Sequence, residues 1–323
     1  MRCTFLFAAG VFALAARAAA QTATGMPPRS LAYVLQAERL GVTRAESVRR
    51  LEACGRDWIV VDPSFDGSSN GTWTAGEIRT IRAGQPGRKV LAYLSIGEAE
   101  DYRAYWKREW VAAPHGRPSA QAPPWLGEAN PAWKGNYRVR YWHADWQQIT
   151  LARAAQAMQQ GFDGIYLDVV DAFETFEYDP RRKDWIDNRR NPETGRTFRE
   201  DMVAWVRRIA AQARQKTPGV LIVPQNGAQL LEDADYLAAI DAIGIEDLFT
   251  DGDKLQKKEH SDYTIGFLKR AAAAGKPVLL IEYGTKAAAV QRSVQGAKAN
   301  QFVLLVTDRE LKTLGQSGTA PLH

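Results

Sequence analysis

The stretch GFDGIYLDVVDAF, residues 161–173, decides the fold because its middle predicts a strand buried on both faces. Acids lie within or beside this strand at Asp163, Asp168 and Asp171. An unpaired buried charge is costly, so acids placed there indicate a function. Asp163 precedes Gly164 and is expected to shape the turn into the strand. The chemistry is therefore expected at Asp168, which ends the strand, with Asp171 just beyond it.

Apolar runs of similar length recur on both sides of this strand, and most are separated by helical patterns. The eight predicted strands are 31–36, 58–62, 89–96, 138–142, 164–170, 220–226, 239–246 and 277–283. Amphipathic patterns predict helices over 198–215 and 261–274, and a capping box of Asp145 with Gln148 predicts a helix to residue 160. Eight β units, most followed by a helix, predict a (β/α)8 TIM barrel.

Two points of this fold stay open in the sequence. A ninth apolar run, 302–307, is either the true closing strand or an added edge. A doubly wound open sheet is the main alternative, although no Gly-rich dinucleotide fingerprint follows the first strand. The connections 97–137 and 173–197, after the third and fifth predicted strands, are long, and long loops in compact domains usually belong to the active site.

The N-terminus predicts export. Residues 1–20 combine a basic start, a short apolar run and small residues before Ala20, which is the pattern of a cleaved signal peptide. A retained membrane anchor is the alternative, but the run is short for crossing a bilayer, so no stable membrane insertion is expected after cleavage. We therefore expect a secreted or periplasmic monomer with a leader at 21–30, one domain at 31–315 and a tail at 316–323.

Charge, cysteine and motif content exclude several classes of function. Cleavage after Ala20 removes Arg2 and Arg17, which lowers the formal net charge from +5 to +3 and gives no indication of nucleic-acid binding. Cys54 then stands alone, so stability must come from a large core. GxSxG, HExxH and P-loop motifs are absent, and the four histidines lack metal-ligand spacing. We predict neither a metal nor a cofactor. His143 could line a cleft, although a surface role is favoured.

Strand alternation selects the candidate catalytic residues. In the fifth strand Tyr166 and Asp168 are expected to point into the barrel, with Asp168 at the end where barrel enzymes place catalytic groups. Glu246 ends the seventh strand in the same way. In the eighth strand we expect Leu279 and Ile281 to face outward and Glu282 inward. Further polar residues expected at the same rim are Asp62, Tyr93, Ser95 and Asn226.

Paired carboxyls on one rim suit glycosidic cleavage, because one can stay ionised while the other is kept protonated. Tryptophans give platforms for sugar rings. Six of the ten lie at 106, 110, 125, 133, 142 and 146, and we expect two or three of them, Trp142 among these, to touch the ligand while the others pack the long third connection onto the barrel.

Several long motifs resemble glycoside hydrolase family 114, the secreted endo-α-1,4-polygalactosaminidase-like group of (β/α)8 barrels. They are LAYLSIGEAEDYRAYW (91–106), PPWLGEANPAWKGNYRVRYW (123–142), GFDGIYLDVVDAF (161–173), VPQNG (223–227), IGIEDLF (243–249) and TDREL (307–311). The resemblance implies a catalytic pair of an Asp ending the fifth strand and a Glu ending the seventh, which match Asp168 and Glu246. We expect Asp168 to be the nucleophile and Glu246 the general acid/base. It also implies a cleft lined by Asp62, Tyr93, Glu98, Asp171, Asn226 and Glu282.

The resemblance implies a galactosamine-containing exopolysaccharide, such as that of a biofilm, as the substrate. An independent indication is that acids gather beyond the predicted strand ends, which would attract a polycationic chain. Two alternatives stay open. One is a non-catalytic polysaccharide-binding protein, which would keep the tryptophans and lose one acid of the pair. The other is a hydrolase of a different α-linked polysaccharide, with the same pair and different subsites.

Overall fold

A parallel sheet forms the centre of the protein. In the computed structural model, which describes residues 26–318, eight parallel strands form two ladders. The first ladder runs in the order β1 (Leu31–Val34), β2 (Trp58–Val61), β3 (Lys89–Ser95), β7 (Gly164–Asp168) and β10 (Leu221–Pro224). The second contains β11 (Ile243–Glu246), β14 (Val278–Glu282) and β15 (Val303–Val306), with the antiparallel β16 (Gln316–Ser317) at its edge. The ladders meet at a parallel bridge between Gln225 and Gly244.

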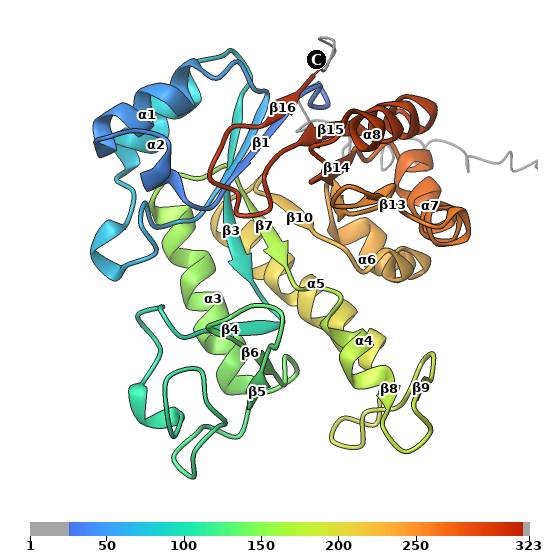
Figure 1. Cartoon of the computed structure of the whole chain (residues 1–323). Helices are drawn as coiled ribbons and strands as arrows, with labels where there is room; N and C mark the ends of the chain where they lie inside the picture. Colours follow the sequence, from blue (N-terminus) through green and yellow to red (C-terminus); the bar gives the residue numbers. More distant parts are fainter. Residues whose placement is uncertain (1–25, 319–323) are drawn as a thin grey trace, which may run out of the picture.

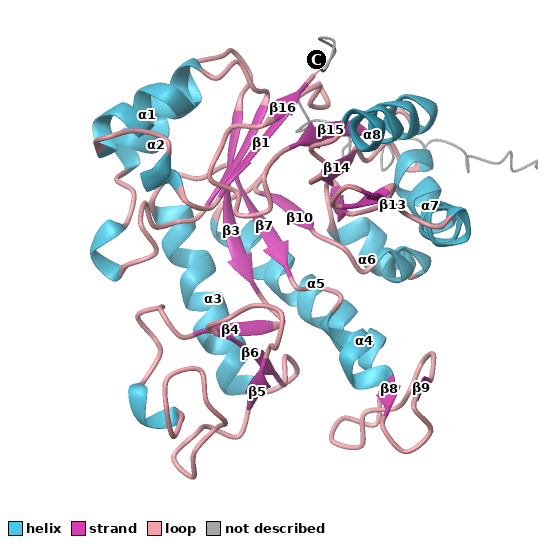
Figure 2. Cartoon of the chain, viewed as in Figure 1, coloured by secondary structure: helices cyan, strands magenta, loops and turns pink. Residues whose placement is uncertain are grey.

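Helices follow most of these strands and lie outside the sheet (Figures 1 and 2). They are α1 (Arg44–Ala53), α2 (Ala75–Ala83), α3 (Ala144–Gln159), α4 (Ala172–Glu177), α5 (Phe198–Lys216), α6 (Ala234–Ala239), α7 (Lys258–Ala273) and α8 (Ala287–Asn300). Short 3-10 turns are η1 (Ala37–Arg39), η2 (Ser69–Gly71), η3 (Arg108–Trp110) and η4 (Ala228–Glu232). Capping boxes begin α2 at Thr74 and α5 at Thr197. The predicted box at Asp145 is wrong, because His143 caps α3 instead.

The side chains of the sheet divide into two apolar clusters. An inner cluster joins residues from both ladders, among them Tyr33, Tyr93, Tyr166 and Leu305. An outer cluster packs the other faces of the strands against the helices. The alternation predicted for the fifth strand is confirmed, since Tyr166 belongs to the inner cluster whereas its neighbours belong to the outer one. The result is an α/β fold with a TIM-barrel-like parallel sheet.

The alternation predicted for β14 is wrong. Leu279 and Ile281 belong to the inner cluster and Leu280 to the outer one, so Glu282 faces outward. All five residues of this strand are buried, so both faces are apolar and the sequence pattern has no period from which to choose. The Glu282 carboxylate accepts hydrogen bonds from the backbone N–H groups of Phe249 (2.8 Å) and Thr250 (3.1 Å), which makes its outward burial possible.

The strand predicted over 138–142 is also wrong as part of the parallel sheet, because β3 pairs directly with β7. Residues 136–139 form β6 (Asn136–Val139), which pairs antiparallel with β4 (Glu98–Glu100) and β5 (Leu126–Ala129) in a separate three-stranded sheet. The ninth run supplies β15, which pairs parallel with β14. The eighth parallel strand is thus the run whose role the sequence left open.

The two long connections project from the carboxyl ends of the strands (Figure 1). The first carries the β4–β6–β5 sheet, and the second carries α4 and the hairpin of β8 (Tyr178–Asp179) and β9 (Asp184–Trp185). A further small hairpin pairs β12 (Thr250–Asp251) with β13 (Lys254–Leu255). Across residues 26–318, none of the helices has the length and apolar character needed to cross a membrane. The predicted signal peptide at 1–20 and the last five residues of the tail lie outside the described part.

Candidate active site

A cavity of about 820 Å³ lies at the carboxyl ends of the parallel strands. Seven of the predicted site residues line it: Asp62, Tyr93, Glu98, Asp168, Asp171, Asn226 and Glu246. They come from the ends of β2, β3, β7, β10 and β11 and from the segments that follow β3 and β7. Because the carboxyl ends of parallel strands share one rim, residues far apart in the chain meet there.

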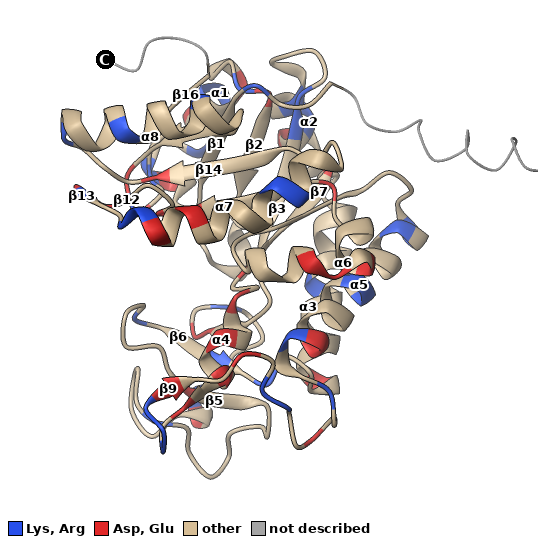
Figure 3. Ribbon diagram, turned by 90° about the vertical axis from the view of Figure 1, so that its right-hand side faces the viewer, with Lys and Arg blue, Asp and Glu red and all other residues tan. Residues whose placement is uncertain are grey.

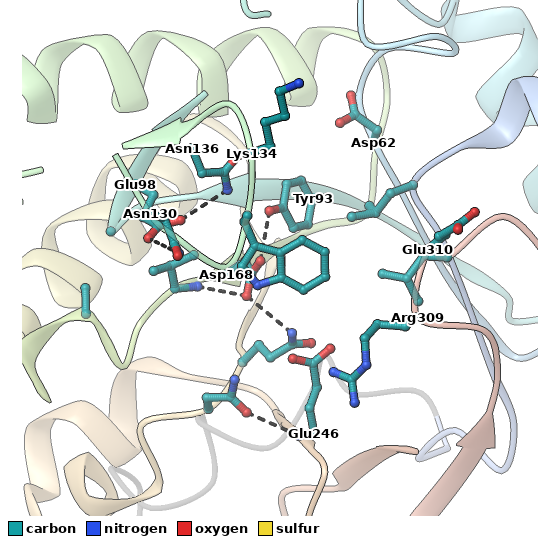
Figure 4. Close-up of a pocket in the computed structure, with 18 of the residues that line it drawn as sticks. Asp62, Tyr93, Glu98, Asn130, Lys134, Asn136, Asp168, Glu246, Arg309 and Glu310 are labelled. Carbon is teal, nitrogen blue, oxygen red and sulfur yellow. Dashed lines mark hydrogen bonds between the residues drawn. The ribbon is translucent and has the colours of Figure 1, made fainter. Parts of the chain in front are cut away.

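Asp168 is held as a hydrogen-bond acceptor (Figure 4). Its Oδ2 accepts from the Tyr93 hydroxyl at 2.8 Å, and its Oδ1 accepts from the backbone N–H of Val169 at 2.8 Å and the Gln225 amide at 3.2 Å. The Gln225 amide is oriented by Tyr166, whose hydroxyl donates to the Gln225 carbonyl oxygen. Burial raises the pKa of Asp168, and these three donors oppose that rise because they stabilise the carboxylate.

Glu246 lies in a different environment on the other ladder. Its side chain accepts one hydrogen bond, from the Tyr283 hydroxyl, and its backbone N–H donates to Asn226 Oδ1 at 3.2 Å. Burial and the nearby Asp168 charge raise the pKa of Glu246 to about 7. Three donors hold the Asp168 carboxylate and one holds the Glu246 side chain, which is the contrast expected between an ionised group and a proton donor.

A second layer holds Glu246 from behind. Arg309 donates to both oxygens of Asp247, at 2.9 and 2.8 Å, and its guanidinium lies 4.3 Å from the centre of the Tyr283 ring. Tyr283 is thereby fixed between Arg309 and Glu246. The residue that follows each carboxyl, Val169 or Asp247, has a positive φ, of 58° and 50° respectively. Such strained backbone costs free energy and is typical of functional sites.

Asp171 and Asn226 complete the centre of the cavity. Asp171 is half-buried, and burial together with Glu174 and Asp168 raises its pKa well above the usual range. Asn226 has a φ of 62°, and its backbone N–H donates to the Gly244 oxygen at 2.9 Å across the meeting point of the two ladders. Asn226 therefore ties the loop after β10 to the strand that carries Glu246.

Glu98 forms one side of the cavity together with the inserted sheet. Its two carboxylate oxygens accept from the side-chain amides of Asn130 (2.7 Å) and Asn136 (3.1 Å), as Figure 4 shows. Burial raises the pKa of Glu98, and the two amides oppose this. The same side carries Trp133 and Lys134.

Asp62 lines the cavity but is engaged in a buried ion network. Arg103 donates to both Asp62 oxygens, at 2.9 and 2.6 Å, and also to both oxygens of Glu100, at 2.7 and 2.8 Å. Burial opposes the charge of Glu100, but Arg103 outweighs it and lowers the pKa of Glu100 to about 2. The network fastens the inserted segment to the end of β2, which indicates that Asp62 supports the site rather than reacting in it.

Four predicted substrate-binding residues lie outside the cavity lining. They are Ser95, Trp142, Tyr166 and Glu282, of which Glu282 faces outward as described above. Ser95 is buried and donates to the Glu98 carbonyl at 2.9 Å. Trp142 packs among Tyr141, Phe176 and Phe198 and donates to Glu193 at 2.8 Å. These four side chains lie outside the cavity lining and have structural contacts.

The tryptophans mostly have the packing role. Of the six between residues 106 and 146, Trp133 alone lines the cavity within the described residues, and it is 51% exposed. Trp110, Trp125 and Trp146 are buried, and Trp125 packs edge to face against Trp110 and at a tilt against Trp146. The expectation that two or three would face the ligand is therefore wrong for this cavity, because the inserted segment needs an aromatic core of its own.

Sequence reasoning missed Tyr283, Gln225 and Arg309. Tyr283 directly follows Glu282, so the error in the alternation of β14 hid it. Gln225 and Arg309 lie in the motifs VPQNG and TDREL. Neither residue has a carboxyl group, and the candidate site was predicted from paired acids. Aromatic and amide donors that orient an acid leave little trace in a sequence, because their partners are set by tertiary contacts.

The parallel sheet, the cavity at its carboxyl rim and the two differently held carboxyls are the arrangement that cleavage of a glycosidic bond requires. The model of glycoside-hydrolase family GH114 matches residues 15–321, nearly the whole chain. The chain belongs to this family.

Two relatives are similar in sequence over most of this chain. An uncharacterized protein of Deinococcus radiodurans is 36% identical over 258 residues, covering 79% of this chain and 74% of its own length. The uncharacterized protein MJ1477 of Methanocaldococcus jannaschii is 37% identical over 235 residues, 71% of this chain, and this chain spans 62% of its length.

Two solved structures share the fold. The glycoside hydrolase domain of PelA from Pseudomonas aeruginosa superposes with a TM-score of 0.61 at 19% identity, over 90% of this chain and 99% of that domain. Ega3 of Aspergillus fumigatus, in its complex with galactosamine, superposes with a TM-score of 0.61 at 17% identity, over 92% of this chain and 98% of Ega3. At such identities the likeness concerns the fold.

Proposed function

We propose that this glycoside hydrolase is secreted and cuts inside α-1,4-linked galactosamine-containing exopolysaccharide, with Asp168 as nucleophile and Glu246 as general acid/base. The observation that carries the assignment of roles is the contrast between the two carboxyls. Asp168 accepts three hydrogen bonds, which suits an anion. Glu246 accepts one at its side chain and has a pKa of about 7, which suits a proton donor near neutral pH.

The excess of acidic over basic side chains in the cavity lining supports a cationic substrate. Its lining includes the acids Glu38, Asp62, Asp66, Glu98, Asp168, Asp171, Glu174, Glu246 and Glu310, against the bases Lys134, Arg138 and Arg309. The helix α4, whose residues Ala172 and Glu174 line the cavity, contains acids and no Lys or Arg (Figure 3). An acidic cavity on a chain with net formal charge +5 concentrates a partly deacetylated, positively charged polymer. The galactosamine bound to Ega3, a protein of the same fold, agrees with this choice.

The shape of the cavity supports cleavage within a chain. In Figure 4, Glu98 and Asn130 lie on one side of Asp168, and Asp62 and Glu310 lie on the other. A polymer can therefore be held on both sides of the reacting centre, as an endo-acting enzyme requires. Such an enzyme would release a range of oligomers from the start of the reaction.

The decisive experiment compares the purified protein with its Asp168→Asn and Glu246→Gln variants on deacetylated and acetylated galactosamine polymers, with products identified by mass. We expect the wild-type protein to cut the deacetylated polymer and each variant to lose activity, by about 10²- to 10⁴-fold for the proton donor. Near wild-type turnover of either variant would refute the assigned roles. Thermal unfolding of the variants checks that the fold is intact.

The same experiment separates the alternatives. Binding without products from any polymer would favour a polysaccharide-binding protein, and products from an α-linked polymer without amino groups would favour a hydrolase of a different sugar. We propose retention of configuration, because the nucleophile assigned to Asp168 implies a covalent intermediate. Proton NMR of the first product formed reports the anomer directly, and an inverted anomer would turn Asp168 into a general base.

Three finer features complete the proposal. We propose that the two ladders close into a (β/α)8 barrel between β1 and β15, which is supported by hydrogen bonds from Leu35 N–H to the Leu311 oxygen and from Leu31 N–H to Ser317 Oγ, both 2.9 Å. We propose export through the predicted signal peptide at residues 1–20. We also propose a monomer, which light scattering of the purified protein would test.

A further inference from the structure

Tyr102 is an exposed aromatic side chain in a cavity, and it is held in one position. It is 52% exposed and lines the cavity. Its hydroxyl donates to Glu100 Oε1 at 2.5 Å, and the Arg103 guanidinium lies 4.8 Å from the centre of its ring. The rim of the ring lies beside Gly67, where an added Cβ would be 3.6 Å from a ring carbon. An exposed aromatic ring that lines a cavity and is held in one position is suited to stacking on a ligand.

The residue before Gly67 carries a carboxylate that has no basic partner among the described residues. Asp66 precedes Gly67 and lines the same cavity. Its Oδ1 accepts from the Ser68 N–H at 3.0 Å, from the Ser68 hydroxyl at 2.7 Å and from the Ser64 hydroxyl at 3.4 Å. No Lys, Arg or His among residues 26–318 forms an ion pair with Asp66. The carboxylate is therefore oriented by neutral donors, and its negative charge is left available to a cation.

The part of the lining around Trp133 differs in charge. There Trp133 is the exposed aromatic residue, and Lys134 and Arg138 lie in the same lining. The side formed by the loop after β2 and by Tyr102 thus favours a cationic sugar more strongly than the Trp133 side does.

We propose that Tyr102 and Asp66 form an outer subsite for a positively charged amino sugar, in which the sugar ring stacks on Tyr102 and its ammonium group faces Asp66. This inference rests on the proposed function, because it assumes that a galactosamine polymer occupies the cavity. The subsite binds a sugar unit outside the one whose bond is cleaved. It therefore affects the preference of the enzyme for substrates of a given length and acetylation, while Asp168 and Glu246 carry out the cleavage.

The first test uses α-1,4-linked galactosamine oligomers of increasing length with the full-length protein and its Tyr102→Ala and Tyr102→Phe variants. Tyr102→Ala should lower kcat/KM about tenfold for oligomers long enough to reach the subsite and leave shorter ones unchanged. Tyr102→Phe keeps the ring and should stay within about twofold of the wild type, since Arg103 and Arg153 still hold Glu100. An equal loss at every length, or no loss at any, overturns the proposal.

Trp185→Ala is the matched control. Trp185 is 62% exposed, more than Tyr102, but it lies on the β8–β9 hairpin and outside the cavity lining. Its removal tests whether loss of any exposed aromatic lowers activity on long chains. A length-dependent loss in this variant equal to that of Tyr102→Ala would overturn the assignment to Tyr102.

The second test addresses the ammonium group. Asp66→Asn keeps an oxygen acceptor for Ser68 and Ser64 and removes the charge. It should raise KM several-fold for long deacetylated oligomers at low salt, with kcat unchanged, and leave N-acetylated oligomers unaffected. Equal effects on both oligomers would show that the amino group is not what Asp66 recognises.

Failure of the proposed function can be told apart from failure of the subsite. If the wild-type protein cleaves no galactosamine oligomer, the proposed function is wrong, and binding of the same oligomers is then measured by calorimetry. Affinity that rises with length and falls in Tyr102→Ala would still support the subsite. Absence of binding, or binding that Tyr102→Ala leaves unchanged, would overturn it.

Discussion

Two tyrosine hydroxyls should control opposite limbs of the pH profile. Tyr283 donates to Glu246 and Tyr93 donates to Asp168, so each hydroxyl stabilises the ionised form of its carboxyl. Replacing either tyrosine by phenylalanine removes that stabilisation and raises the pKa of the partner. If Asp168 must be ionised and Glu246 protonated, Tyr93→Phe moves the acidic limb of kcat/KM to higher pH, and Tyr283→Phe moves the basic limb to higher pH.

The size of these movements follows from the strength of the bonds. A hydrogen bond to a charged group contributes about 1.5 to 3 kcal/mol, part of which water recovers when the hydroxyl is lost. A movement of about one pH unit corresponds to about 1.4 kcal/mol. The basic limb, near pH 7 for Glu246 in the wild-type protein, should therefore rise to about pH 8 in Tyr283→Phe. The Tyr283 ring stays in place against Arg309, so the packing is conserved.

The assay measures initial rates on one soluble oligomer from about pH 4 to about pH 9 at constant ionic strength. Tyr33→Phe is the control, because Tyr33 lines the same cavity and no hydrogen bond of its hydroxyl occurs among the described residues. Its limbs should match those of the wild type. A shift of the acidic limb in Tyr283→Phe, or of the basic limb in Tyr93→Phe, would reverse the assigned roles, and a shift in neither variant would refute the reasoning.

Three further outcomes are expected. Arg103→Met leaves two buried carboxylates without their main partner and should lower the free energy of unfolding by about 3 to 5 kcal/mol in urea titrations. Arg50→Met removes an exposed ion pair on a helix and is the control; it should lower the free energy of unfolding by less than about 0.5 kcal/mol. Gly244→Ala places a Cβ 2.0 Å from the Tyr166 hydroxyl and should lower both stability and kcat, and an unchanged kcat would contradict the role of this contact. Because the pKa of Glu246 is raised from 4.5 to about 7 in the folded state, the stabilisation from its protonated form is present below about pH 4.5 and lost as the pH rises through 7. Glu246→Gln should therefore raise the unfolding temperature at pH 8 and not at pH 4, and equal stability at both would contradict this sign.

The direction in which strand side chains point was predictable where a polar residue lies within an apolar strand. In β7 the hydroxyl-bearing Tyr166 lies two positions before Asp168 and marks the same face, and the prediction for Tyr166 is confirmed. In β14 no polar residue precedes Glu282, so the alternation was unreadable and its phase was predicted wrongly. The pattern of 138–142 has a polar residue at every other position at its start, as in a sheet with one exposed face. That alternation distinguishes β6 from a strand of the parallel sheet. The run 138–142 was nevertheless predicted as a barrel strand, because it completed a set of eight β units.

The candidate site was predictable to the extent that it consists of acids at strand ends. Asp168 and Glu246 were found in this way because a carboxyl after an apolar run is unusual. The donors that set their states were not found, since Tyr283 and Arg309 act through contacts between the ends of β14 and β15 and the loop after β11. Likewise, the packing of Trp125 against Trp146 inside the insertion depends on a small sheet whose existence the loop length alone did not reveal.

The meeting point of the two ladders bears on how the enzyme could be tuned. Asp168 belongs to the first ladder and Glu246 to the second, and the ladders are joined at Gln225, Asn226 and Gly244. The separation of the two carboxyls is therefore set where the two ladders meet. Because Gln225 donates to Asp168 and Asn226 accepts from the backbone N–H of Glu246, a substitution there would change the reach of the proton donor to the scissile oxygen while both acids are kept. Altered linkage preference would then arise where the two ladders meet, while the pocket walls stay the same.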